Sequence, residues 1–298
     1  MSGIPGSPFR VILLAAAIST LLAACSFPSD IKNLRKQANA GNPEAQFSLG
    51  VMYDNGQGVR QDHAEAVKWF RKAAEQGEST SQYNLGVSYY TGRGVAQDYA
   101  EAAKWFRKAA EQGDLEAQFN LGLMYDDGQG VPQDYAEARK WYLKAAWRGN
   151  KNAQSNLGFM YDKGQGVPQD YAEATKWYRK AAVQGDKNAQ FNLALMYFNG
   201  MGVPQDYFEA VEWFRKAAEQ EHAGAQIYLG SMYAAGQGVP QDFLQSYFWS
   251  NLAASRASGD ESRQASDLRD MAAKKLTPGK LAEAQHMTRE WEKSHPRK

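Results

Sequence analysis

The chain has 298 residues, of which 43% are hydrophobic and 12% aromatic, enough for a packed core and unlike an intrinsically disordered protein. Its 34 basic residues nearly balance its 33 acidic residues, so the composition gives no reason to expect nucleic acid as a partner. The single cysteine, Cys25, excludes a disulfide within the chain.

The chain begins with a short apolar segment. Val11–Leu21 follows one basic residue, Arg10, and its eleven residues fit the core of a secretory signal peptide. A membrane-spanning helix would need about 20 residues. The next four residues, LAAC, end at Cys25 and resemble the lipobox of bacterial lipoproteins, whose cysteine is acylated and becomes the mature N-terminus. The resemblance implies a lipoprotein signal peptide over residues 1–24 and Cys25 as the lipidation site.

Acylation would decide where the protein resides. Two or three acyl chains on Cys25 would hold it stably at a membrane. The residue after the cysteine is Ser26 and not an aspartate, which resembles the outer-membrane sorting pattern of lipoproteins. For a Gram-negative host we therefore expect the protein at the periplasmic face of the outer membrane. Two alternatives stay open. The segment could be an ordinary secretory signal with an incidental Cys25, or it could be inert and leave a cytoplasmic scaffold.

Residues 25–41 are interpreted as the lipid-anchored N-terminus and a capping half-repeat. Ser29 and Asp30 can cap a helix that ends at Gly41. Gly41 lies 36 residues before Gly77, a spacing that recurs through the chain. This helix therefore takes the place of half a repeat and covers the exposed edge of the first complete one.

A fixed period of 36 residues marks residues 42–257. Its clearest members are Trp69, Trp105, Trp141, Trp177, Trp213 and Trp249. Such a period is typical of a solenoid, because each unit can bury its hydrophobic face only by stacking on its neighbours. The sequence therefore predicts six stacked repeats without an insertion.

The third copy shows what one repeat contains. Apolar residues at helical spacing predict a first helix around residues 117–125 and a second around 138–145. Between them, the glycines of DDGQG end the first helix and allow positive φ, as Gly128 illustrates. Asp134 stands three residues before Glu137, which predicts a capping box at the start of the second helix.

The last part of the chain, residues 258–298, is interpreted as a helical cap and tail. The pattern predicts three helices near the C-terminus, over Phe243–Ala257, about Asp260–Lys275, and Thr277 to about Lys293. Thr277 and the proline after it form an N-cap and a first-turn proline.

Sequence signals for chemistry are absent. The four histidines are scattered, and no HExxH, CxxC, GxSxG, Walker A or GxGxxG motif occurs. The acids of DDGQG lack the ligand spacing of an EF-hand loop, and they vary between copies while the glycines persist. We therefore expect no catalytic residue, no metal site and no cofactor.

AQFNLGLMYDDGQGVPQDYAEARKWYLKAA, residues 117–146, resembles the Sel-one-like repeat (SLR), a relative of the tetratricopeptide repeat. The resemblance implies an all-α fold, a right-handed α-solenoid of antiparallel helix pairs that acts as a non-enzymatic scaffold or adaptor for other proteins. Some cysteine-rich members are described as β-lactamases, so a cell-wall or β-lactam hydrolase is the alternative. One departure is Ala194, where the other copies have glycine, and we expect a slight local spreading of two helices.

The resemblance also implies a partner surface, because first helices line the concave face of tetratricopeptide folds. The partners would be envelope or periplasmic proteins. The binding residues predicted on this face are Tyr83, Val87, Tyr90, Phe119, Leu123, Asp126, Phe159, Asp162, Phe191, Leu195 and Phe198. The alternative is that some of these aromatics pack between repeats and never meet a partner. A ladder of glutamines, one in each copy, is expected to form hydrogen bonds between repeats.

Overall fold

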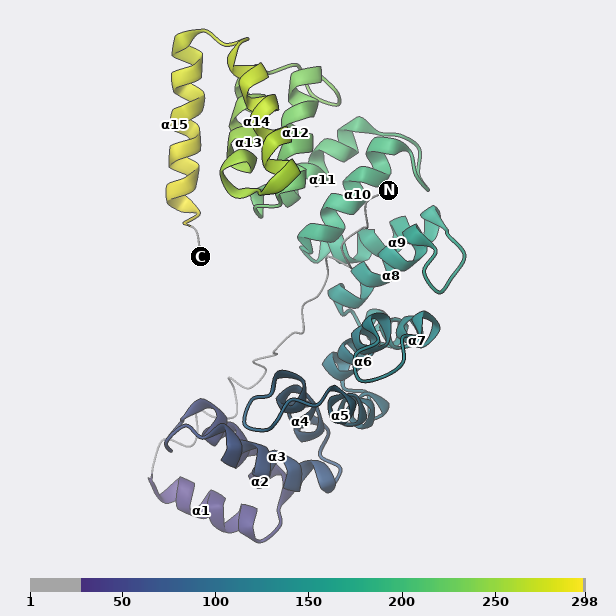
Figure 1. The fold of residues 1–298 in the computed structure, drawn as a ribbon, viewed down its shortest axis with the longest axis vertical. Coiled ribbons are helices and arrows are strands. Elements are labelled where there is room, and N and C mark those ends of the chain that lie inside the picture. Colours follow the sequence, from purple (N-terminus) through teal and green to yellow (C-terminus); the bar gives the residue numbers. More distant parts are fainter. Residues whose placement is uncertain (1–27, 297–298) are drawn as a thin grey trace. The chain divides into compact units, whose positions relative to one another are not determined.

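The computed structural model describes residues 28–296, and side chains from residue 31. These residues form helices and loops with no strand among them, so the prediction of an all-α fold is confirmed. The helices are α1 (Pro28–Asn39), α2 (Pro43–Asn55), α3 (His63–Glu75), α4 (Ser79–Thr91), α5 (Tyr99–Glu111), α6 (Leu115–Asp127), α7 (Tyr135–Trp147), α8 (Lys151–Lys163), α9 (Tyr171–Val183), α10 (Lys187–Asn199), α11 (Tyr207–Glu219), α12 (Ala223–Ala235), α13 (Phe243–Arg256), α14 (Gly259–Ala273) and α15 (Pro278–Ser294) (Figure 1).

The chain divides into two compact units, and the boundary between Ala153 and Gln154 falls within α8. In the first unit α2 pairs with α3, α4 with α5 and α6 with α7, and successive pairs stack through α3 on α4 and α5 on α6. The second unit repeats this order, with α10 paired to α11 and α12 to α13. Each unit is therefore a stack of helix pairs, as the 36-residue period predicts.

The turn between paired helices depends on two glycines. Gly128 ends α6 with φ of 70°, and Gly130 follows with φ of 69°, both in the left-handed region that favours glycine. A Cβ on Gly130 would also lie 2.2 Å from the backbone of Tyr99 at the start of α5. The second glycine is thus required by the conformation of the turn and by its close approach to the preceding repeat.

The aspartate caps of the second helices form, but the predicted capping box does not close. Asp134 accepts a hydrogen bond from the backbone N–H of Glu137 at 3.0 Å. The reciprocal bond is replaced, because the N–H of Asp134 donates to the carbonyl of Tyr125 at 2.9 Å. Glu137 instead pairs with Lys140 at 2.8 Å. The box is wrong in this half because the end of the first helix already uses the N–H that the glutamate would need.

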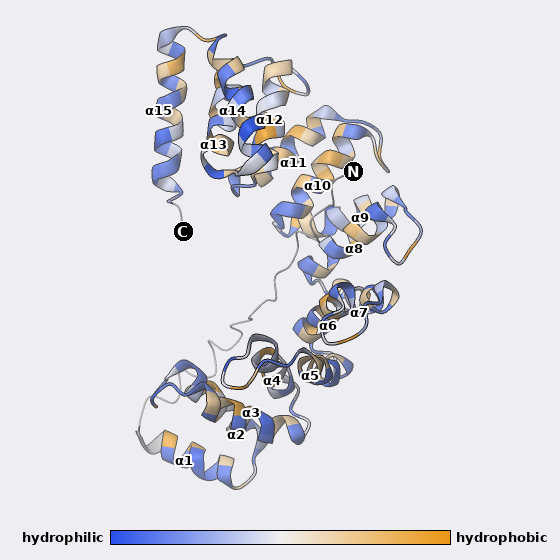
Figure 2. Cartoon of the chain, in the orientation of Figure 1, coloured by the Kyte–Doolittle hydropathy of each residue, from blue (hydrophilic) through white to orange (hydrophobic). Residues whose placement is uncertain are grey.

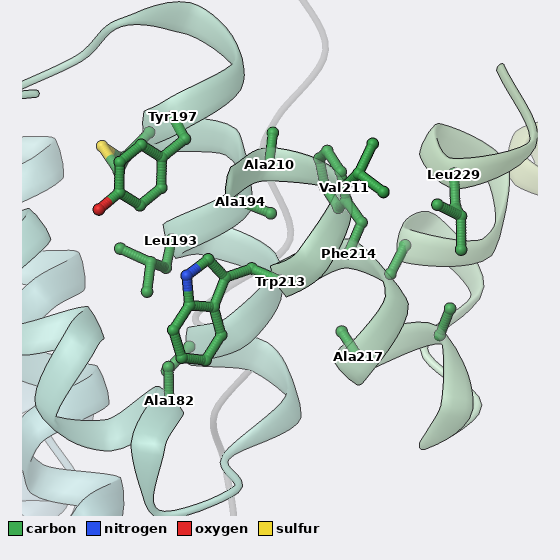
Figure 3. Close-up of a cluster of buried hydrophobic side chains, with 14 of the residues drawn as sticks. Ala182, Leu193, Ala194, Tyr197, Ala210, Val211, Trp213, Phe214, Ala217 and Leu229 are labelled. Atoms are coloured by element: carbon green, nitrogen blue, oxygen red, sulfur yellow. The ribbon is translucent and has the colours of Figure 1, made fainter. Parts of the chain in front are cut away.

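Each repeat places a tryptophan and an aromatic ring of its second helix in the core. Figure 3 shows this arrangement around Trp213 and Phe214 of α11, together with Leu193 and Ala194 of α10. In the third repeat, a Cβ on Gly122 would lie 2.6 Å from the ring of Tyr142, so a glycine allows the two helices to approach.

Two ladders of hydrogen bonds join the helices. The glutamine ladder is confirmed: Gln82 donates to the carbonyl of Ala74 in the preceding repeat at 3.1 Å and accepts from Gln112 at 2.8 Å. The second ladder joins an arginine to a tyrosine eighteen residues later, and Arg71 donates to the hydroxyl of Tyr89 at 2.6 Å. The other members are Arg35–Tyr53, Arg107–Tyr125, Arg179–Tyr197 and Arg215–Tyr233.

Helix α1 follows the pattern of a second helix. The guanidinium of Arg35 donates to the hydroxyl of Tyr53 at 3.2 Å, which is the first member of the arginine–tyrosine ladder. Leu34 and Ala38 of α1 pack with Leu49 of α2. Its apolar residues Ile31, Leu34 and Ala38 recur at i, i+3 and i+7 among polar residues, which is the spacing of an amphipathic helix (Figure 2).

At the other end, Arg256 of α13 gathers several contacts. It forms an ion pair with Glu221 at 2.5 Å, donates to the carbonyl of His295 at 2.8 Å, and its guanidinium lies 4.7 Å from the ring centre of Trp291. These contacts tie α15 to the last repeats. Glu221 occupies the turn position that is glycine in the preceding copies, and it is held at φ of 64°.

The predicted signal peptide and Cys25 lie outside the described residues. Between residues 28 and 296, no helix is both long enough and apolar enough to cross a membrane.

Candidate protein-interaction surface

The predicted partner-binding side chains do not share one environment. In the first unit Tyr83, Phe119 and Leu123 are buried, with exposed fractions of 4%, 0% and 5%. Val87 and Tyr90 are half-buried. For the three buried residues the packing alternative describes the structure, since no partner could reach them without displacing their neighbours.

The contacts of these rings explain their burial. Tyr83 lies 5.7 Å, between ring centres, from Phe106, and Phe119 lies 6.0 Å from Tyr142. Both partners belong to the second helix of the same repeat. Tyr90 donates from its hydroxyl to Gln129 of the next repeat at 2.7 Å. These first-helix aromatics therefore hold helix pairs and repeats together.

The predicted acids are also engaged. Asp126 accepts a hydrogen bond from the hydroxyl of Tyr142 at 3.2 Å. Asp162 is buried and pairs with Lys163 at 2.9 Å. Burial, with the charge of Asp162 nearby, raises the pKa of the Tyr178 hydroxyl well above its ordinary value, so that group stays neutral. These acids are therefore part of the packing between helices.

The second unit presents a different surface. Phe159, Phe191, Leu195 and Phe198 are half-buried and pack on the hydrophobic core of this unit. Tyr228 of α12 lies beside two of them, with ring centres 5.9 Å from Phe191 and 5.7 Å from Phe198. We call Phe191, Phe198 and Tyr228 the aromatic patch.

Tyr228 makes the aromatic patch accessible. It is 36% exposed, among the few large hydrophobic side chains of the described chain that reach this level. Its ring also stacks on Phe214 of α11, with centres 5.0 Å apart and an angle of 15° between the planes. One face of Tyr228 is thus anchored on the core, and the remaining surface can meet another molecule.

His222 supports the patch from the loop before α12. Its ring stacks on Phe191, with centres 4.4 Å apart, and its Nδ1 accepts a hydrogen bond from the N–H of Ala225 at 3.2 Å. Burial, reinforced by the positive charge of Lys187, lowers the pKa of His222 to about 4. The ring is therefore a neutral helix cap at ordinary pH.

The part of the chain between residues 28 and 296 contains no group of three or more His, Cys, Asp or Glu side chains that could hold a metal ion. What the geometry offers is a set of rings that packs on Phe214 and on His222, whose imidazole is neutral at ordinary pH. Such a surface suits hydrophobic contact with a protein segment.

The comparisons with known proteins agree with this architecture. A family model, the Sel1 repeat, matches residues 43–78, 79–114, 115–150, 151–186, 187–222 and 223–258. The chain belongs to the Sel1 repeat family. Among curated proteins, no match to the chain is found.

Solved structures include other Sel1 repeat proteins. One from Oxalobacter formigenes is 34% identical, with a TM-score of 0.71, and the match covers 78% of this chain and 95% of that one. A protective antigen of uropathogenic Escherichia coli with an SLR fold is 27% identical, with a TM-score of 0.47, and the match covers 89% of this chain and 87% of that one. Proteins with Sel1 repeats typically act as scaffolds for protein–protein interaction.

Within the Sel1 repeats, Tyr228 was missed in the sequence prediction, although a signal was present. It occupies the position held by Asn84, Asn120, Asn156 and Asn192 in the four preceding copies. A single aromatic in a ladder of asparagines marks the sixth Sel1 repeat as different. His222 carries a similar signal, because the corresponding caps in the earlier copies are asparagine, aspartate or glutamate.

Proposed function

We propose that this Sel1 repeat protein is a non-enzymatic adaptor of the cell envelope, anchored through an acylated Cys25, that binds partner proteins on the first helices of its repeats. The aromatic patch of α10 and α12 is the principal contact. The partial exposure of Tyr228 carries this proposal, because the other large aromatics of the first helices are more deeply covered.

The chemistry of the patch favours a hydrophobic partner segment. Large, rigid rings that are partly exposed and packed from beneath dominate binding energy in protein interfaces. Phe191 and Phe198 lie seven residues apart on α10, which is two helical turns, and Tyr228 faces them from α12. A helix or an extended segment with two hydrophobic side chains at a similar spacing would bury all three rings.

Site-specific photocrosslinking tests the contact. A photoreactive amino acid replaces Tyr228 in one strain and Phe208 in another, and adducts are identified by mass spectrometry. Phe208 is a suitable control because it is 63% exposed but lies on the second helix α11. We expect a defined partner adduct at position 228 only, and we expect Phe198→Ala to reduce its yield severalfold while thermal unfolding confirms a folded chain.

Equal labelling at positions 228 and 208 would contradict the proposed patch. Cys25→Ser, introduced into the same strains, tests the anchor, because this substitution is expected to release the protein from the membrane fraction. An unchanged membrane fraction would contradict acylation at Cys25 without bearing on the aromatic patch.

A further inference from the structure

Helix α1 carries a basic stripe. Lys32, Arg35 and Lys36 recur at i, i+3 and i+4, so they share one helical face, and all three side chains are exposed. No acidic residue occurs between residues 31 and 43. The one acidic residue of α1, Asp30, precedes the stripe, so the helix has three cations against one anion, and the loop that follows adds no acid.

The opposite face of α1 fixes the direction of this stripe. Leu34 and Ala38 pack with Leu49, and the Ile31 side chain approaches the turn at Gly58, where an added Cβ would lie 2.7 Å from it. Because these apolar residues are held against the first repeat, the lysines point away from the protein. The stripe is a fixed surface of the fold.

A fourth cation extends the basic surface across the neighbouring turn. An open recess lies between α1 and the turn after α2, and Arg35, Tyr53, Arg60 and Asp62 line it. Asp62 is the N-cap of α3, and its carboxylate accepts a hydrogen bond from the N–H of Glu65 at 2.9 Å. Arg60 is exposed. The equivalent positions in later repeats are Ala96, Pro132, Pro168, Pro204 and Pro240.

We propose that Lys32, Arg35, Lys36 and Arg60 dock the N-terminal end of the first unit on the anionic phospholipid headgroups of a bilayer. This inference rests on the proposed function for its reason, since an acylated Cys25 would bring the stripe to the membrane. Only Ser26 and Phe27 separate Cys25 from α1, and three extended peptide steps span about 10 Å.

The distances suit electrostatic attraction. Lys32 and Lys36 lie four and eight residues into α1, which places them about 6 Å and 12 Å along the helix from its start. Each basic residue close to an anionic bilayer strengthens partition about fivefold at moderate ionic strength. Acyl chains with a basic surface would therefore hold both the position and the orientation of this end of the protein.

Vesicle binding tests the inference without acylation. The mature chain, residues 25–298 with an unmodified Cys25, is mixed with two kinds of vesicle. One is pure phosphatidylcholine, and the other contains about 30 mol% of the anionic lipid phosphatidylglycerol. Binding is measured by co-sedimentation. We expect binding to the anionic vesicles only, weakened at high salt. Lys32→Gln with Lys36→Gln should reduce the partition coefficient roughly 25-fold.

A matched variant separates local from general charge effects. Lys274→Gln with Lys275→Gln removes two exposed cations from the turn between α14 and α15, so the net charge falls equally. This control should retain wild-type binding. The inference is overturned if the wild-type chain ignores anionic vesicles, if neutral vesicles bind it equally, or if the control loses as much binding as the α1 variant. Binding by the wild type that is unaffected by the α1 variant also overturns it.

The outcome is independent of the aromatic patch. The unacylated chain binds or ignores vesicles whether or not Cys25 is modified in the cell, and the substitutions on α1 leave the partner contact at Tyr228 in place. Failure of the vesicle test would therefore leave the proposed adaptor function standing.

Discussion

Phe119 in the first unit and Phe191 in the second occupy the same position of the repeat, yet they differ in exposure and in their neighbours. Phe119 is completely buried against Tyr142. Phe191 also meets the ring of its second helix, Phe214, but it remains half-buried and shares its surface with His222 and Tyr228. A position in a repeat therefore fixes which ring a residue touches within its own helix pair, and the surrounding residues decide whether it remains available to a partner.

The largest test of this comparison replaces each ring in turn. Phe119→Ala should cost about 3–5 kcal/mol of stability, because it leaves a cavity where a fully buried ring stood. Phe191→Ala should cost roughly half as much, because its ring is partly exposed already. Urea unfolding of the two variants measures the difference.

The same pair separates stability from binding. At equal concentrations of folded protein, we expect Phe191→Ala to weaken partner capture. Phe119→Ala should reduce capture only by lowering the folded fraction. Substitution of Phe119 is therefore unsuitable as a test of partner contact, contrary to what its place among the predicted binding residues suggests. Equal losses of stability in the two variants would show that the two positions are packed alike.

The fold could be predicted from the sequence because its signals are local and repeated. A turn glycine such as Gly130, a cap such as Asp134 and a core residue such as Trp141 recur every 36 residues, and each depends on neighbours at fixed spacing. Errors arose where two groups compete for one partner. The N–H of Asp134 binds Tyr125, so the glutamate three residues later has none to accept from.

The candidate surface could be predicted only in part. Helical spacing places Phe119 and Phe191 on one face of their helices, but exposure depends on side chains from other helices that the spacing does not describe. Tyr228 decides the difference in the second unit, and it departs from the asparagine found in four earlier copies. Departures from the repeat, more than its regular positions, indicate where a surface is specialised.

Acid should sharpen the contrast between the units. The pKa of His222 is lowered to about 4 by burial and by Lys187, whereas in the unfolded chain it is near 6.5. Between these values the unfolded chain binds a proton that the folded chain excludes, so the stability present above pH 6.5 is lost as the pH falls towards 4. The full loss is roughly 3 kcal/mol.

Asp114 caps α6 in the first unit, and burial raises the pKa of its carboxyl, so its protonation shifts stability in the opposite direction as the pH falls. The His222 contribution is isolated by His222→Asn, because Asn42 caps α2 in the same way without titrating. Urea unfolding at pH 7 and pH 4.5 should show a larger loss for the wild type than for this variant. Identical losses would mean that His222 does not titrate as its burial predicts.

The smallest effect concerns the turn that precedes the first helix of a repeat. Gly185 adopts φ of +82° with open space around it, so Gly185→Ala should cost about 1 kcal/mol through backbone conformation alone. Glu221 holds the equivalent turn at φ of 64° and pairs with Arg256 at 2.5 Å. Glu221→Ala keeps the unfavourable backbone and loses the ion pair, whereas Glu221→Gly loses the ion pair but relieves the backbone. Thermal unfolding should therefore rank Glu221→Gly above Glu221→Ala by about the cost measured at Gly185, and the reverse order would show that the side chain at this turn, and not its φ, sets the stability.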